Sequence, residues 1–92
     1  ILVAPFAPPG SAELAAHVRN TIGTNAGLLM ANHGAIGTGL TMEDAMISSD
    51  NVERACEMYL AILGAGRQVR KLPEDYMEMA KKKSLARRNV VL

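Results

Sequence analysis

The long amphipathic stretch after Thr41 constrains the fold of this 92-residue chain more than any other feature. Apolar residues recur at roughly helical spacing from Ala45 to Leu63, and Gly64 and Gly66 end the pattern. At 1.5 Å per residue, about 22 helical residues span ~33 Å, which is long for a chain of this size. The apolar surface is also wide. We therefore expect the helix to lie across a sheet larger than the strands of this chain can form.

Two short segments before this helix favour strands. Residues 26–31 are an apolar run without helical spacing, and the glycine-rich stretch 35–40 suits a second strand better than a helix. Asn32 and Gly34 between them accept positive φ at low cost. The pattern predicts a β-hairpin with His33 at or beside the turn, at the end of the sheet.

The remaining elements follow from cap residues and prolines. Residues 1–10 indicate a strand end running into a proline-rich loop. Ser11 is expected to cap a helix that ends at Gly23, and Thr41 to cap the long helix. A third helix is expected to begin at Pro73.

Composition favours a soluble globular protein and excludes several other classes. Apolar residues make up 49% of the chain and the formal net charge is +1, so no global attraction to nucleic acid or membrane is expected. No apolar run approaches the ~20 residues of a membrane span, and no signal peptide is visible, which favours a cytoplasmic protein. Five basic residues between 81 and 88 lack aromatic neighbours and are expected to form a solvated helix end.

Two chemistry-bearing side chains are assigned structural roles. Cys56 is the only cysteine and lies on the apolar stripe of the long helix, so we expect a packed thiol. His17 lies off the apolar stripe of the first predicted helix, so we expect a solvated surface residue.

The chain opens on Ile1 as if within a strand, and we expect residues 1–92 to be the C-terminal part of a single longer domain whose N-terminal part is absent.

His33 is the residue whose chemical role the sequence leaves undecided. A zinc site needs three or four ligands, and the chain has no His-x-His, no His-Glu-x-x-His and no second cysteine. Glu43 and Asp44 are explained as favourable charges at a helix start. From the residues alone, His33 is a turn or core histidine, a metal ligand, or a general base.

Three stretches of the chain resemble the C-terminal half of the class II aldolase and adducin head family. They read VAPFAPPGSAELA, GLLMANHGAIGTGLTMEDAM and NVERACEMYLAIL, and they cover roughly residues 3–63. The resemblance implies an α/β fold with α/β/α layers and a central, mainly antiparallel sheet. This chain would supply the C-terminal helix, hairpin and long helix of that fold.

The resemblance also implies a metal-dependent activity. In catalytic family members the histidine of the Asn-His-Gly motif, here His33, is one of three histidines that coordinate Zn²⁺ or another divalent transition metal. The other two ligands and the acid/base glutamate would lie in the absent N-terminal part, so the catalytic residues are unknown in this chain. The implied function is that of a lyase of carbohydrate metabolism, an aldolase that reversibly cleaves a ketose 1-phosphate through a metal-stabilised enediolate. Its implied partners are a phosphorylated sugar and further copies of itself in a homotetramer, and this segment alone is expected to be inactive.

Other readings remain open at this point. Related family members are 4-epimerases or dehydratases, and adducin heads are non-catalytic interaction modules. Asn32 and Gly34 are expected to form the turn. Glu53 is assigned to buried or interface hydrogen bonding, with support of the metal ligands as the alternative, and Tyr59 to packing.

Overall fold

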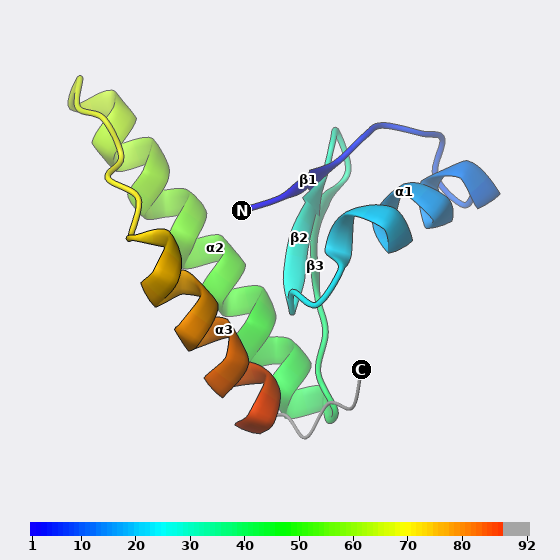
Figure 1. Cartoon of the computed structure of the whole chain (residues 1–92). Coiled ribbons are helices and arrows are strands. Elements are labelled where there is room, and N and C mark those ends of the chain that lie inside the picture. Colours follow the sequence, from blue (N-terminus) through cyan, green and yellow to red (C-terminus); the bar gives the residue numbers. More distant parts are fainter. Residues whose placement is uncertain (88–92) are drawn as a thin grey trace.

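The computed structural model of the chain describes residues 1–87 and shows a small α/β arrangement (Figure 1). Its elements are β1 (Val3–Ala4), α1 (Ala12–Ile22), β2 (Gly27–Met30), β3 (Gly34–Gly37), α2 (Met42–Gly64) and α3 (Glu74–Arg87). The predicted order of helix, hairpin and long helix is confirmed.

The three strands form one sheet in the order β1-β2-β3. β1 runs parallel to β2, with Val3 opposite Leu29, and Leu29 N–H donates to the Leu2 carbonyl at 2.9 Å. β2 and β3 are antiparallel, as the hairpin prediction requires. Helix α1 is therefore the crossover between two parallel strands. One of the two pairings is parallel, so these strands alone do not make the sheet mainly antiparallel.

The helices begin where the capping residues predict. Ser11 Oγ accepts a hydrogen bond from Leu14 N–H at 3.1 Å, and Thr41 Oγ1 accepts one from Asp44 N–H at 3.1 Å. Met77 N–H donates to the Pro73 carbonyl at 3.0 Å at the start of α3. The two side-chain bonds each satisfy an amide of the first helical turn that has no backbone partner within the helix.

Small residues allow α2 to lie close against the hairpin. A side chain at Gly37 would meet the backbone of α2, with its Cβ 2.6 Å from Ser49 N and 2.7 Å from the Ala45 carbonyl oxygen. Ser48 Oγ donates to the Thr38 carbonyl at 2.8 Å and ties the two elements together. The absence of a side chain at Gly37 thus fixes the position of α2 on β3.

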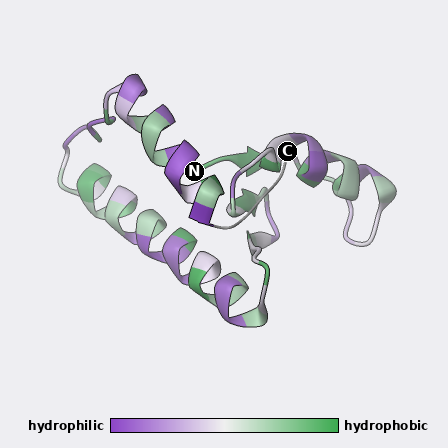
Figure 2. Cartoon of the chain, turned by 60° about the horizontal axis from the view of Figure 1, so that its bottom comes forward, coloured by the Kyte–Doolittle hydropathy of each residue, from purple (hydrophilic) through white to green (hydrophobic). Residues whose placement is uncertain are grey.

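The core of the described residues is small. Its buried hydrophobic members are Ala4, Ala7, Leu28 and Val52. Helix α1 contacts β1 and β2, while α2 contacts β2 and β3. In Figure 2, hydrophobic and hydrophilic residues alternate along α2, so its apolar residues are spread along the whole helix.

Most of the apolar residues of α2 stay exposed. Tyr59 is 49% exposed and Leu60 66% exposed, so the described residues cover only about half of the surface of Tyr59, for which packing was predicted. Glu53 is also exposed, which contradicts a buried hydrogen-bonding role, while a hydrogen bond at an interface stays a prediction. Cys56 is partly buried, in line with a packed thiol. These exposures follow from a three-stranded sheet that covers only part of a 23-residue helix.

Helix α3 stands apart from the sheet. It contacts none of the other helices and strands of residues 1–87, and Lys81, Lys82, Lys83 and Arg87 are exposed, as expected of a solvated helix end. Arg88, the fifth basic residue of that prediction, lies outside the described residues. Within residues 1–87, no helix combines the length and the apolar character needed to cross a membrane.

Candidate metal centre

The tight turn between β2 and β3 presents His33 at the end of the sheet, as predicted. Asn32 adopts φ 64°, a left-handed conformation that asparagine tolerates better than most residues, and Gly34 adopts φ 141°. His33 N–H closes the turn by donating to the Met30 carbonyl at 3.0 Å. The ring therefore projects from backbone that is hydrogen-bonded on the strand side.

The His33 ring is held by the segment Pro5–Ala7, far away in the sequence. Its Nε2 lies 2.8 Å from the Ala7 carbonyl oxygen, and its face stacks on Phe6 with ring centroids 5.3 Å apart and planes 21° apart. Because a carbonyl only accepts, Nε2 is the donor. A neutral His33 ring in this geometry carries its lone pair on Nδ1.

This hydrogen bond also serves the backbone. Ala7 is only 2% exposed, and buried carbonyl groups in folded proteins are nearly always hydrogen-bonded. His33 supplies the partner. The contact therefore satisfies the backbone and fixes the imidazole at once.

The second histidine is not the solvated surface residue that the sequence predicts. The His17 side chain is 26% exposed, and its Nδ1 lies 3.0 Å from the Pro5 carbonyl oxygen. Its Nε2 lies 3.9 Å from Glu13 Oε1, one helical turn earlier on α1. The prediction failed because a position off the apolar stripe need not face solvent. Here the His17 ring contacts a polar backbone group of the proline-rich segment.

The described residues provide one candidate ligand rather than a complete metal site. In the part of the chain that the structure describes, no three or more histidine, cysteine, aspartate or glutamate side chains gather closely enough to hold a metal ion. Glu43 and Asp44 lie exposed in the first turn of α2, in agreement with their assignment as helix-start charges. A tetrahedral zinc site would need donors beyond His33.

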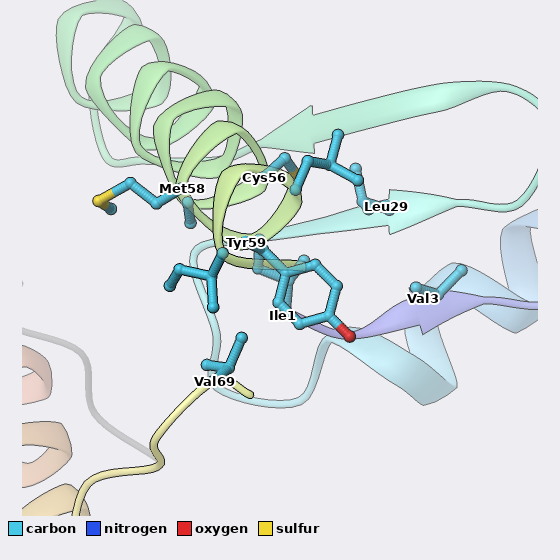
Figure 3. A pocket seen from close by; sticks show the side chains of 10 residues that line it. Ile1, Val3, Leu29, Cys56, Met58, Tyr59 and Val69 are labelled. Atoms are coloured by element: carbon cyan, nitrogen blue, oxygen red, sulfur yellow. The ribbon is translucent and has the colours of Figure 1, made fainter. Parts of the chain in front are cut away.

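An apolar cavity of about 730 Å³ lies between the C-terminal half of α2 and the first two strands (Figure 3). Cys56 and Tyr59 are among its lining residues, together with Ile1, Val3, Leu29, Ala55, Met58, Leu60, Ile62 and Val69. His33 is not part of this lining. The cavity offers apolar surface and is separate from the histidine turn.

The residues around the imidazole are the part of the site that sequence reasoning missed. Ala7 precedes Pro8, which favours extended backbone, and this proline spacing was the only local signal. It does not indicate which side chains meet the carbonyls of the segment. Those partners are 12 and 26 residues away along the chain.

Comparison with known proteins places the chain in context. The family model described as "Class II Aldolase and Adducin N-terminal domain" matches residues 1–60. The chain is 31% identical over 75 residues to the L-fuculose phosphate aldolase of Haemophilus influenzae, covering 82% of this chain and 35% of that protein. It is 31% identical over 62 residues to the 3-oxo-tetronate 4-phosphate decarboxylase of the same organism, covering 67% of this chain and 30% of that protein.

The chain spans about a third of the length of these curated relatives. No solved structure gives a significant match. The matched region includes the proline-rich segment, the hairpin and most of α2. Helix α3 lies beyond it.

Proposed function

Because the chain belongs to the class II aldolase and adducin family, we propose that it forms part of a divalent-metal-dependent lyase in which His33 is one ligand of the metal. The supporting observation is the presentation of the His33 ring. It projects from a hydrogen-bonded turn, and its Nε2 is bonded to the Ala7 carbonyl. Histidines that bind metals commonly donate their other ring N–H to a backbone carbonyl, which fixes the tautomer.

His33 fits the role of one ligand, and the proposal assigns the rest of the site elsewhere. Nδ1 is available while Nε2–H is bonded to Ala7, and coordination through Nε2 requires that this hydrogen bond opens. The other ligands and the acid/base glutamate come from polypeptide outside these 92 residues, in keeping with the third of the relatives' length that the chain spans. A divalent cation supplies Lewis-acid stabilisation of negative charge on substrate oxygens when it is bound.

The proposed reaction is reversible C–C cleavage of a phosphorylated ketose, after the aldolase relative. The decarboxylase relative favours a second candidate, loss of CO₂ from a phosphorylated 3-oxo acid. The two reactions share one electronic demand. Each breaks the bond between the α carbon of a carbonyl group and a carbon substituent, which leaves as an aldehyde or as CO₂. The electron pair left on the α carbon is delocalised onto the carbonyl oxygen. One electrostatic design therefore suits either substrate class.

The proposal includes a homo-oligomer, and the exposed side of α2 is the surface that it would cover. Met58, Leu60 and Leu63 are 63%, 66% and 47% exposed. Apolar patches of this kind commonly mark interaction sites. The larger α/β/α layering, with further strands across α2, would cover the same surface.

The proposal is tested with the variant His33→Ala in the complete protein, which includes the polypeptide that supplies the other ligands. We expect it to lose most of its stoichiometric divalent metal, measured by elemental analysis, and its cleavage of phosphorylated ketoses, measured by aldehyde release. Asn20→Ala is the matched control, because Asn20 is an exposed residue of α1 outside the histidine turn. Full metal content in His33→Ala would refute the ligand assignment.

The same measurements separate the candidate functions. Aldehyde release favours the aldolase, and CO₂ release from a 3-oxo acid phosphate favours the decarboxylase. Change of configuration at one carbon would indicate an epimerase, and loss of water a dehydratase. Wild-type protein without metal and without turnover would indicate an adducin-like interaction module.

A further inference from the structure

The segment Pro5–Ala7 is hydrogen-bonded to both histidines of the chain. From α1, His17 Nδ1 reaches the Pro5 carbonyl oxygen at 3.0 Å, and from the hairpin turn, His33 Nε2 reaches the Ala7 carbonyl oxygen at 2.8 Å. Phe6 lies between these two carbonyls and stacks on the His33 ring. Two hydrogen bonds and one aromatic contact thus meet on three consecutive residues.

The two histidines stand in different relations to this segment. His33 is exposed and receives two of its ring contacts from the segment, whereas His17 is partly buried and extends from the middle of a capped helix. A helix of 11 residues is a firmer anchor than a three-residue turn. We therefore take α1 as the element that holds Pro5 in place, and the segment Pro5–Ala7 as the element that orients the His33 ring.

We propose that His17 is a positioning residue, which holds Pro5–Ala7 so that Phe6 and the Ala7 carbonyl fix the orientation and tautomer of His33. The metal-binding consequence rests on the proposed function, because it takes His33 as a ligand. The effect on the His33 ring does not. The two can therefore fail separately.

The first test reads the His33 ring directly, by ¹⁵N-detected NMR of the imidazole nitrogens at a pH where both rings are neutral. We expect wild-type protein to show one dominant tautomer at His33, with the proton on Nε2. His17→Ala should shift His33 toward a mixture of tautomers. An unchanged His33 spectrum in His17→Ala would overturn the proposal.

A conservative variant distinguishes positioning from a merely structural role. The side-chain nitrogen of asparagine takes about the place of Nδ1, so His17→Asn can still donate to the Pro5 carbonyl. Alanine is the better helix former, so a purely helix-stabilising role predicts that His17→Ala behaves better than His17→Asn. Positioning predicts the opposite order, with His17→Asn close to wild type. If the His33 tautomer stays closer to wild type in His17→Ala than in His17→Asn, the proposal is contradicted.

The second test measures metal affinity in the assembled protein, with Zn²⁺ alone as the probe. Loss of an outer hydrogen-bond partner of a metal-ligating histidine typically weakens binding by about 10–100-fold, and we expect His17→Ala to fall near the lower end. Asn20→Ala on the same helix should bind as wild type. If wild type binds zinc through His33 and His17→Ala binds it equally well, the positioning role is refuted while the proposed function stands. If His33→Ala keeps its metal, the proposed function fails and the NMR test still decides the role of His17.

Discussion

Replacement of Gly37 by alanine tests whether close contact with α2 sets the position of the hairpin. The new Cβ would lie 2.6 Å from Ser49 N and 2.7 Å from the Ala45 carbonyl oxygen, whereas ordinary van der Waals contact begins at 3.4 Å. The helix and strand would have to separate by roughly 0.8 Å, the difference between 3.4 Å and the 2.6 Å to the nearest backbone atom. The atoms in the way belong to the backbone of α2 as well as to Ser49, so rotation of one side chain does not relieve the clash.

Two opposing effects set the expected magnitude. Overpacking of this kind costs about 1–3 kcal/mol, while alanine reduces the entropy of the unfolded chain and returns about 0.4–1 kcal/mol. We expect a net loss in the free energy of unfolding of about 1–2 kcal/mol, because the steric term acts at the contact between α2 and the hairpin. Urea unfolding followed by circular dichroism at 222 nm measures this change through the midpoint and the slope.

Gly64→Ala in α2 is the matched control. Gly64 is the last residue of α2, has no positive φ, and a Cβ there would meet no atom within 4 Å. Alanine in that place should leave stability unchanged or raise it by up to about 1 kcal/mol. Equal or greater stability of Gly37→Ala relative to wild type would refute the steric argument.

Further predictions concern the turn and the core. Asn32→Ala should lower the free energy of unfolding by about 1 kcal/mol, because alanine tolerates the left-handed φ of 64° poorly; Asn32→Gly should be close to neutral in the same urea experiment, and an equal loss in both variants would contradict this reason. Leu28→Ala should cost about 2–5 kcal/mol, because Leu28 is the largest fully buried side chain of the described residues. A loss below about 1 kcal/mol in thermal or urea unfolding would show that the small core collapses around the gap.

Local features of the sequence predicted the local features of the fold. Ser11 and Thr41 each accept from an amide three residues later, so cap and helix start can be read from one short stretch. The Asn-His-Gly turn is equally local, and its position in the hairpin was predicted together with that of His33. These elements depend on interactions within a few residues.

The environment of the candidate ligand depends on contacts between distant residues, and sequence reasoning missed it. The parallel pairing of β1 with β2 brings the proline-rich segment beside the hairpin turn, and neither strand encodes that pairing in its own pattern. His17 was misjudged for the same reason, because its partner is a backbone carbonyl, and carbonyls carry no sequence signal. The exposure of Tyr59 reflects a surface that three strands leave uncovered.

The parallel pairing has a consequence for the order in which the protein folds. β2 and β3 are joined by three residues, so the hairpin can close within microseconds, whereas β1 must wait for the whole of α1 to bridge the gap. We expect the imidazole at position 33 to reach its turn early and to meet its carbonyl acceptor late. During refolding from denaturant, the ring would therefore rotate freely in the interval before β1 pairs with β2.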